Sequence, residues 1–170
     1  VYKGLDSVTN EHVAIKVETN SKAPRLEYEK KLYELLNNHK GIPQIKWDGK
    51  IARKKLLIMD YLGPSLDDLY KFCGNKFGLK TVSMIALQIL YRIEFIHKSS
   101  ILHRDSKPDN FLIGSGKKKK RIYIIDFGLS KKYINEKKHT EYKKGKSFTG
   151  SFRYSSIRNH KGVEQSRRDD

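Results

Sequence analysis

Apolar and polar positions divide the chain into a strand-rich first part and a second part that begins with helices. Short runs of β-branched and aromatic residues between turn residues are typical of strands. These runs predict strands over residues 1–4, 12–18, 44–47, 55–59, 111–113 and 122–125. Apolar residues at helical spacing predict helices over residues 25–37, 65–73 and 79–99.

The helix over residues 79–99 is the longest predicted element. Its apolar positions fall on one helical face at Val82, Ile85, Ala86, Ile89, Ile93 and Ile96. We therefore expect this face to belong to the core. Residues 131–170 are polar, basic and weakly periodic, so we predict no long element there. A loop of that length inside a compact domain is normally functional or disordered.

Composition places the chain among folded proteins and excludes several other classes. Its 170 residues are 37% apolar, 32% charged and 11% aromatic, and the aromatic content argues against disorder. Cys73 is the only cysteine, which excludes an internal disulfide and a cysteine metal cluster. No apolar run approaches the roughly 20 residues of a membrane span. We therefore expect an intracellular protein, cytoplasmic or nuclear, without a membrane span.

The net charge of +17 is concentrated in one part of the chain. Between Lys117 and Lys161 there are fifteen Lys and Arg residues against three acidic residues. Such a field attracts nucleic acid, an anionic membrane surface, or acidic and phosphorylated protein. A solvated lysine-rich surface accounts for the charge equally well.

The strongest chemical signal is the segment His103-Arg104-Asp105-Ser106-Lys107-Pro108-Asp109-Asn110, followed by Asp126-Phe127-Gly128. Phosphoryl transfer from a metal-bound nucleotide needs one carboxylate to orient a hydroxyl, and an amide with a second carboxylate to hold magnesium. Asp105, Asn110 and Asp126 supply these groups at matching intervals. We expect the strands at 111–113 and 122–125 to place all three at one end of a hairpin.

Val13-Ala14-Ile15-Lys16 adds a lysine at the end of a β-branched run. Alone, such a lysine is more often a charge on an edge strand. Beside the later motif it fits a lysine that holds the α and β phosphates. Its partner would be a helix carboxylate, for which Glu27, Glu29 and Glu34 are candidates.

Together these motifs resemble the eukaryotic protein kinases, and more narrowly the casein kinase 1 family of Ser/Thr kinases. The narrower resemblance rests on Gly41-Ile42-Pro43, Leu62-Gly63-Pro64-Ser65-Leu66, Lys107 to Leu112, Tyr123 to Leu129, and Glu164-Gln165-Ser166-Arg167-Arg168-Asp169-Asp170. The last segment stands where most kinases have Ala-Pro-Glu. Ser106 stands where an apolar residue is usual, which puts the local packing in question.

The resemblance implies an α+β fold, protein-kinase-like with two lobes, truncated to the small β-rich lobe and the first half of the helical large lobe. Residues 1–62 would form a partial N-terminal lobe with the hinge. Residues 63–170 would form a partial C-terminal lobe with the catalytic and activation segments. Val1 matches the valine that closes the glycine-rich loop, so we expect a fragment. Asp170 matches the aspartate that anchors the His-Arg-Asp loop.

The implied function is transfer of the γ-phosphoryl group of ATP, with Mg²⁺, to Ser or Thr of acidic or pre-phosphorylated proteins. The resemblance assigns catalysis to Asp105 and Lys107, and magnesium binding to Asn110 and Asp126. It selects Glu29 as the partner of Lys16. The expected nucleotide-binding residues are Val1, Ala14, Lys16, Glu29, Met59, Asp60, Leu62, Leu112 and Ile125. The basic side chains expected to bind a substrate anion are Arg153, Lys131 and Lys146.

Two other functions remain open from the sequence. A fragment without its glycine-rich loop would be a non-catalytic binding module. The basic window would also suit a nucleic-acid-binding module, although its aromatic residues are not interleaved with the basic ones as a stacking platform requires. We therefore do not expect nucleic acid as the partner, and the oligomeric state is left open.

Overall fold

The computed structural model describes residues 1–19, 25–37, 39–135 and 138–170. Its contacts divide the chain into two compact units, each built from two segments. The first unit comprises Val1–Ser65 and Leu112–Gly128. The second unit comprises Leu66–Phe111 and Leu129–Asp170.

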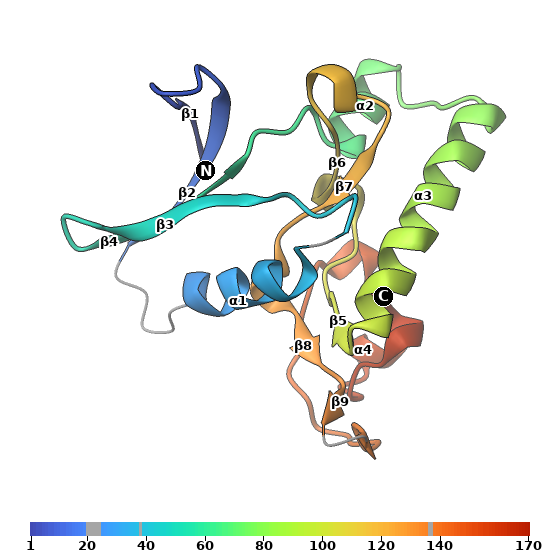
Figure 1. The fold of residues 1–170 in the computed structure, drawn as a ribbon. Helices are drawn as coiled ribbons and strands as arrows, with labels where there is room; N and C mark the ends of the chain where they lie inside the picture. The colour runs from blue at the N-terminus through green and yellow to red at the C-terminus, as the bar shows by residue number, and fades with distance from the viewer. Residues whose placement is uncertain (20–24, 38, 136–137) are drawn as a thin grey trace. The chain divides into compact units, whose positions relative to one another are not determined.

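A four-stranded antiparallel sheet forms the largest part of the first unit (Figure 1). Its spatial order is β1-β2-β4-β3. The strands are β1 (Tyr2–Leu5), β2 (His12–Thr19), β3 (Ile45–Ile51) and β4 (Lys54–Asp60). The register of the two central strands places Ala14 opposite Met59 and Lys16 opposite Leu57. Buried Val13, Leu57 and Met59 contribute to the core of this unit.

Helix α1 (Leu26–Leu36) lies along this sheet and contacts β3 and β4 (Figure 1). Its buried face consists of Leu26, Glu29, Leu32, Tyr33 and Leu36. The first backbone N–H groups of a helix lack partners within the helix. Here the Oε1 atom of Glu18, from β2, accepts hydrogen bonds from the backbone N–H groups of Arg25 at 2.8 Å and Leu26 at 3.1 Å. The sheet therefore fixes where this helix begins.

Residues 112–128, which the sequence assigned to the large lobe, pack in the first unit. They include most of β6 (Phe111–Ile113) and all of β7 (Ile122–Ile124), which pair with each other, and a 3-10 turn at Gly116–Lys118. The backbone N–H of Gly63 donates to the Ile113 carbonyl at 2.8 Å, and that of Ile124 donates to the Gly41 carbonyl at 2.9 Å. These bonds join the hairpin to the segments on either side of β3 and β4.

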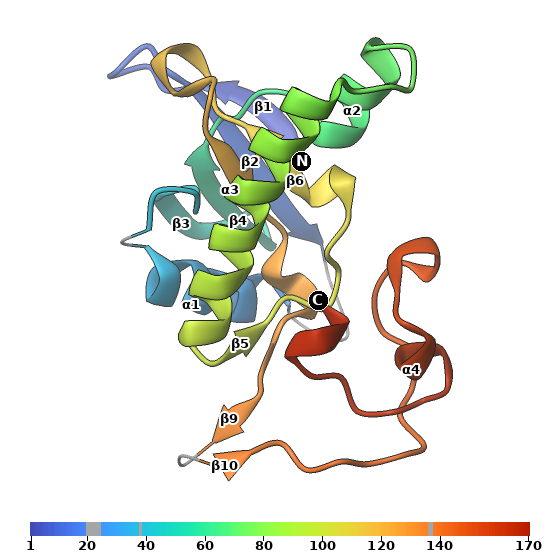
Figure 2. The same ribbon diagram turned by 90° about the vertical axis from the view of Figure 1, so that its right-hand side faces the viewer.

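The second unit is built from short elements around one long helix. Its helices are α2 (Leu66–Phe72), α3 (Leu79–Lys98) and α4 (Ile157–His160). Its strands are β5 (Ile101–Leu102), β8 (Lys131–Lys132), β9 (Ile134–Asn135) and β10 (Lys138–His139). Single 3-10 turns lie at Pro108–Asn110, Phe152–Tyr154 and Arg167–Asp169, and another at Phe127–Leu129 spans the boundary of the units. β5 pairs with β8 and β9 with β10, the latter as a small hairpin (Figure 2).

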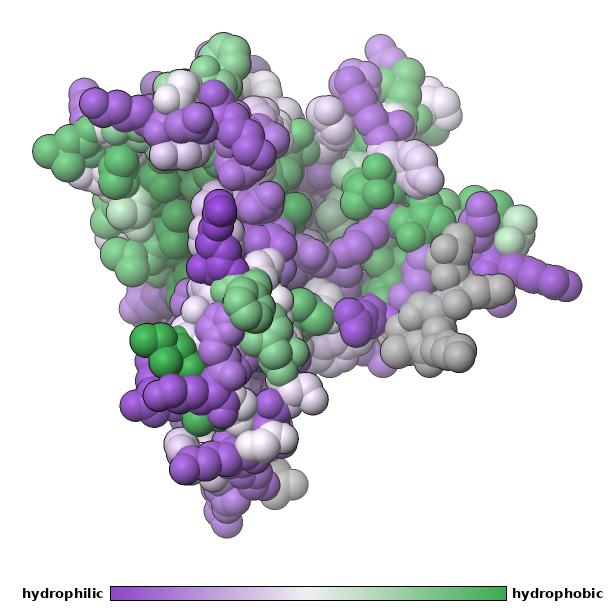
Figure 3. Space-filling view, turned by 180° about the vertical axis from the view of Figure 1, so that it is seen from behind, coloured by the Kyte–Doolittle hydropathy of each residue, from purple (hydrophilic) through white to green (hydrophobic). Residues whose placement is uncertain are grey.

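Helix α3 forms as predicted, but its predicted apolar face lies in the core only in part. Ile96 is buried, Ile85, Ile89 and Ile93 are partly exposed, and Val82 is 46% exposed. Apolar residues outside that face are also exposed, namely Leu79, Met84, Leu87, Leu90 and Tyr91. Figure 3 shows apolar residues gathered over this helix. The described residues of the second unit cover only the C-terminal end of α3, which leaves the rest of the helix partly or fully exposed. None of the helices formed by the described residues is long and apolar enough to cross a membrane.

The β3–β4 connection also differs from the sequence prediction. Strands were predicted over residues 44–47 and 55–59, yet β3 continues to Ile51 and β4 begins at Lys54. The turn consists of Ala52 and Arg53, with φ angles of 44° and 65°. Two-residue hairpin turns of this kind usually contain Gly or Asn, because both positions are left-handed. The absence of those residues hid the turn in the sequence.

Candidate active site

Lys16 and Glu29 form an ion pair in the first unit. Lys16 lies on β2, and its Nζ atom donates to both carboxylate oxygens of Glu29, at 2.8 and 2.7 Å. Glu29 comes from the buried face of α1 and is 2% exposed. A buried carboxylate requires such a partner, since an unpaired charge is strongly disfavoured in the interior. Among the three candidate glutamates, the structure thus joins Glu29 to Lys16.

Asp126 belongs to the same cluster. Its Oδ1 atom lies 2.9 Å from the Nζ atom of Lys16. Its backbone is left-handed, with φ of 67°. Its N–H donates to the hydroxyl oxygen of Tyr33 at 3.0 Å, and the Tyr33 ring packs edge-to-face against Phe127 with centroids 5.0 Å apart. Helix α1 therefore positions both the carboxylate that binds Lys16 and the segment that carries Asp126.

The charges of this cluster influence one another. Burial by itself opposes the charge on Lys16, but attraction to Glu29 and Asp126 raises the pKa of the Lys16 ammonium above its ordinary value. Burial raises the pKa of the Glu29 carboxyl, and the Lys16 ammonium opposes that rise. Burial, followed by the negative charge of Glu29, raises the pKa of Tyr33 well above its ordinary value. Tyr33 is therefore a neutral phenol, and its oxygen accepts the Asp126 N–H.

A second polar cluster lies in the second unit around Asp105. The Nδ2 atom of Asn110 donates to the backbone carbonyl of Asp105 at 2.9 Å and to its Oδ2 atom at 3.2 Å. The Nζ atom of Lys107 lies 3.0 Å from the same Oδ2 atom. The Oδ1 atom of Asp105 is buried and has no hydrogen-bond partner among the described residues. One oxygen of the Asp105 carboxylate is therefore held in place, while the other is a buried acceptor without a partner among the described residues.

The loop that carries Asp105 is anchored by Asp170, as expected from the sequence. The carboxylate of Asp170 accepts hydrogen bonds from the backbone N–H groups of His103 at 2.8 Å and Arg104 at 2.6 Å. The Nε2 atom of His97 lies 2.9 Å from the same carboxylate. Arg104 has φ of 67°, a left-handed conformation that costs energy in a residue with a side chain. The hydrogen bonds to its own and the preceding N–H hold it there.

The segment after Leu129 contacts the same loop. The Nε atom of Arg104 donates to the Leu129 carbonyl at 2.6 Å. The Nζ atom of Lys107 also donates to the Oγ atom of Ser151 at 2.8 Å. The hydroxyl of Ser106, at the position where an apolar residue was expected, is buried and has no hydrogen-bond partner among the described residues. Serine at position 106 thus buries a hydroxyl group that gains no hydrogen bond from the described residues.

The donor sets of both clusters fit a hard divalent cation. The Asn110 amide nitrogen is used by Asp105, which leaves the amide oxygen as the atom available for a metal. Asp126 contributes a carboxylate whose side chain is 47% exposed and whose Oδ1 atom contacts Lys16. Carboxylate and amide oxygens are the ligands that Mg²⁺ prefers.

The residues expected to bind a nucleotide all lie in the first unit. Ala14 and Met59 are partners across β2 and β4. Val1 is 84% exposed. The backbone N–H of Asp60, in the predicted hinge, donates to the Gln44 carbonyl at 3.0 Å. This N–H therefore already has a hydrogen-bond acceptor within the protein. Leu62, Leu112 and Ile125 are partly exposed. Leu62 follows β4, Leu112 lies on β6, and Ile125 follows β7.

The residues expected to bind a substrate anion are only partly brought together. Lys131 and Lys146 share one carboxylate, that of Glu164, at 2.7 and 3.3 Å. Arg153 is exposed in the turn at Phe152–Tyr154 and pairs with no carboxylate among the described residues. Glu164 therefore offsets part of the charge on which the anion prediction relied.

Three residues of these clusters were missed from the sequence. Tyr33 lies in the helix predicted over residues 25–37, and nothing in its spacing marks a contact with Asp126. Ser151 lies 44 residues beyond Lys107 in a segment without periodicity. Glu164 was read only as part of the casein kinase 1-like segment. Its two lysine partners are 33 and 18 residues away, a separation that sequence pattern does not resolve.

Residues 1–158 match the family model described as "Protein kinase domain". The match includes every residue of the two clusters except Glu164 and Asp170. It confirms the predicted α+β fold of the kinase type, and it implies the use of ATP and a protein substrate. Lys16 paired with Glu29, and Asp105 held by Asn110, agree with the arrangement of charges that phosphoryl transfer requires. The chain belongs to the protein kinase family.

Proposed function

We propose that this protein is a Ser/Thr kinase of the casein kinase 1 type, which transfers the γ-phosphoryl group of ATP to acidic or pre-phosphorylated proteins. The observation that carries the proposal is the environment of Asp105. Asn110 and Lys107 hold its Oδ2 atom, and its buried Oδ1 atom has no partner among the described residues. In this proposal the Asp105 carboxylate, held by Asn110 and Lys107, is the acceptor that orients a substrate hydroxyl.

The remaining groups have distinct roles in this proposal. Lys16, held by Glu29, binds the α and β phosphate oxygens, and Lys107 neutralises charge on the phosphoryl group during transfer. Asn110 and Asp126 are the magnesium ligands, and the ion would offset the negative charge of the phosphates. The Nζ atom of Lys16 also lies 2.9 Å from Asp126, so phosphate oxygens would share this ammonium with two carboxylates.

Residues around the hinge bind the adenosine part of the nucleotide in this proposal. Ala14 and Met59 face each other across the central strands. We assign apolar contacts with the base to these two residues together with Val1, Leu62, Leu112 and Ile125. The Asp60 N–H is bonded to Gln44, so the base would use other backbone groups of the hinge.

The preference for acidic or phosphorylated substrates rests on Arg153, Lys131 and Lys146. Arg153 is exposed and pairs with no described carboxylate, and a guanidinium matches carboxylate and phosphate geometry. Lys131 and Lys146 carry two positive charges against the single negative charge of Glu164. An intracellular location, cytoplasmic or nuclear, accords with Cys73, a free thiol.

The proposal is tested by phosphate transfer from radiolabelled ATP to matched peptides in the full-length protein. We expect a Ser peptide with acidic or phosphorylated flanks to be a better substrate than its neutral version, and a Tyr version to be inactive. Asp105→Asn and Asp126→Asn should each lower kcat by at least about a hundredfold. Asn keeps the shape of Asp, and it tolerates the left-handed backbone of residue 126.

Glu94→Asn is the control, because Glu94 forms only an exposed pair with Lys98 on α3. Unchanged turnover in Asp105→Asn would refute the catalytic role of that residue. Equal rates on acidic and neutral peptides would refute the substrate preference while leaving the reaction intact.

A further inference from the structure

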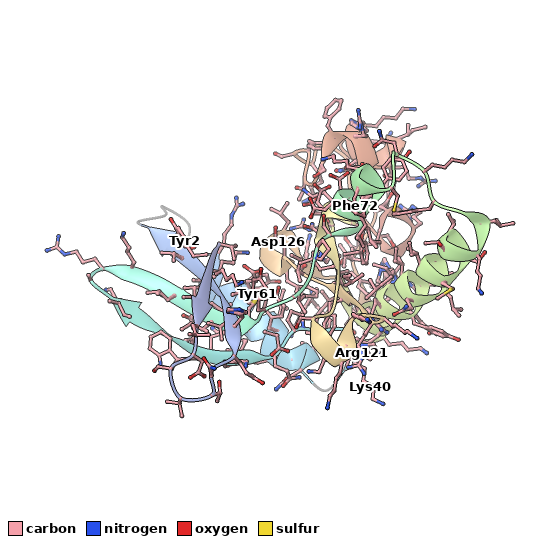
Figure 4. The ribbon with its side chains drawn as sticks, turned by 90° about the horizontal axis from the view of Figure 1, so that it is seen from above. Tyr2, Lys40, Tyr61, Phe72, Arg121 and Asp126 are labelled. Atoms are coloured by element: carbon pink, nitrogen blue, oxygen red, sulfur yellow. The ribbon has the colours of Figure 1, made fainter. Side chains whose placement is uncertain are left out.

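A cavity in the first unit lies between two loops that phosphoryl transfer does not use. Its volume is about 290 Å³. One wall follows α1 and includes Lys40 and Gln44, and the other precedes β7 and includes Lys118 and Arg121. Figure 4 labels Lys40 and Arg121 close together and apart from Asp126. Buried Tyr123 and partly exposed Asp60 also line this cavity.

Backbone hydrogen bonds fix both walls of this cavity. The Ile124 N–H donates to the Gly41 carbonyl at 2.9 Å, which ties one wall to the other. The Arg121 N–H donates to the Lys118 carbonyl at 2.9 Å, and the Arg121 carbonyl accepts from the Gly114 N–H at 2.8 Å. An added Cβ at Gly114 would clash with the Lys118 carbonyl oxygen, so the loop closes tightly around this glycine. The basic side chains therefore project from a preformed backbone.

The cations of this cavity lack the carboxylate partners that other lysines of the unit have. Lys30 pairs with Asp48 at 2.8 Å, and Lys46 pairs with Glu11 at 2.6 Å. Among the described residues, Lys40, Lys118 and Arg121 form no ion pair, while Asp60 is the one acidic residue in the lining. The Asp60 Oδ2 atom accepts from the Gln44 N–H at 3.2 Å. An anion entering the cavity thus meets three cations and one carboxylate.

A second cavity of about 420 Å³ adjoins the first and shares Asp60, Lys118 and Tyr123 with it. It is lined further by Tyr61 and His12, whose rings meet edge-to-face at 5.8 Å, and by the Glu11–Lys46 pair. We name the two cavities together the basic groove. The first cavity, with its three basic side chains, suits a compact anion. The second cavity offers aromatic and charged contacts to the molecule that bears this anion.

We propose that the basic groove binds a phosphorylated Ser or Thr within a peptide segment, with the phosphate between Arg121, Lys40 and Lys118. Arg binds phosphate through two parallel hydrogen bonds, and Lys adds point charges. A nucleic acid fits less well, since Asp60 and Glu11 repel a continuous phosphate backbone. The Tyr61 ring also meets His12 edge-to-face, and the Nζ atom of Lys3 lies 5.1 Å from its centroid, which leaves less of the ring for stacking with a base.

This inference goes beyond the proposed reaction, because Lys16, Asp105 and Asp126 do not line the basic groove. Of the residues expected to bind the nucleotide, the groove includes Asp60 and Leu62. The groove would serve as a docking site for a phosphorylated partner or substrate. Its loss would weaken binding of that partner and leave phosphate transfer to an unrelated short peptide intact.

The test is fluorescence anisotropy with a labelled phosphoserine peptide and its serine counterpart, in full-length protein carrying Asp105→Asn so that no transfer occurs. We expect the phosphopeptide to bind and the serine peptide to bind at least about tenfold more weakly. Adding Arg121→Gln or Lys40→Gln should weaken phosphopeptide binding at least about tenfold. Lys119→Gln is the matched control, because Lys119 is an exposed cation of the same loop that does not line the groove.

Arg153→Gln distinguishes the basic groove from the proposed substrate-anion site. Binding that is lost with Arg153→Gln and kept with Arg121→Gln would overturn the proposal, as would equal loss with Lys119→Gln. A single-stranded RNA probe that binds more tightly than the phosphopeptide would also overturn it. Thermal melting of each variant shows that it is folded, and Arg121→Gln in otherwise unmodified protein should keep its kcat on a short acidic peptide.

Discussion

Tyr33 connects helix α1 to the segment that holds Asp126, through one hydroxyl group. The ring is 2% exposed, and the hydroxyl oxygen accepts the Asp126 N–H at 3.0 Å. A partly buried N–H that loses its acceptor keeps its desolvation cost without compensation. The position of Asp126 therefore depends on a residue that has no charge and touches no substrate.

Tyr33→Phe should lower the free energy of unfolding by about 1–3 kcal/mol, because the packing of the ring stays while its oxygen is removed. Urea denaturation of both proteins measures the difference. Tyr2→Phe is the control, since Tyr2 is 67% exposed. A loss below about 0.5 kcal/mol for Tyr33→Phe would show that the hydrogen bond contributes little.

Glu164 links Lys131 and Lys146. Although burial alone would raise it, hydrogen bonds from the two ammonium groups lower the pKa of the Glu164 carboxyl below its ordinary 4.5. A carboxyl whose pKa is lowered by folding stabilises the protein above its unfolded pKa. This stabilisation is lost as the pH falls through the lower, folded value.

Glu164→Gln should therefore lower the free energy of unfolding at pH 7 by about 2 kcal/mol. It should also make stability fall less steeply between pH 5 and pH 3 than in the unmodified protein. Melting temperatures across that range test both effects, and Glu94→Gln on the exposed face of α3 is the control. Parallel pH profiles for the two proteins would contradict the assigned role.

At the scale of elements, much of the fold was predictable because local pattern and local structure agree. The alternation of the first strands, the period of α3 and the position of Lys16 thirteen residues before Glu29 are visible in the sequence. The burial of α3 was not predictable, because an apolar face does not reveal what covers it. The contacts of Ser151 and Glu164 were not predictable either, since they join segments that share no period.

The β3–β4 turn was also hidden, and it gives a prediction of its own. Arg53 has φ of 65°, where a side chain costs about 1–2 kcal/mol and glycine costs little. Arg53→Gly should raise the free energy of unfolding by about 0.5–1 kcal/mol. The backbone strain that glycine removes in the folded protein exceeds the conformational entropy that glycine adds to the unfolded chain. Urea denaturation measures it. Lys50→Gly, within β3, should be destabilising, and the same sign for both changes would refute the explanation.

At the scale of the whole molecule, charge is the dominant property. A chain of 170 residues with a net charge of +17 repels itself in any compact state. Several lysines offset this repulsion by forming ion pairs, as Lys16 does with Glu29 and Lys131 with Glu164. The loop before β7 has no such compensation at Lys118 and Arg121 among the described residues.

Salt should therefore stabilise the protein at neutral pH. Raising NaCl from 20 to 300 mM shortens the range of repulsion to less than about 10 Å. Screening that recovers about 1 kcal/mol would raise the melting temperature by about 2–4 °C. KCl should act equally, whereas a fall in melting temperature with both salts would show that ion pairs outweigh the repulsion.

The contact between Asp170 and the loop at His103 and Arg104 bears on the order of events during synthesis. The two backbone bonds join residues that are 67 and 66 positions apart. The loop that carries Asp105 therefore cannot be held in this way until a carboxylate made 66 residues after Arg104 has been synthesised. During translation, the segment at His103 and Arg104 exists before the group that orders it.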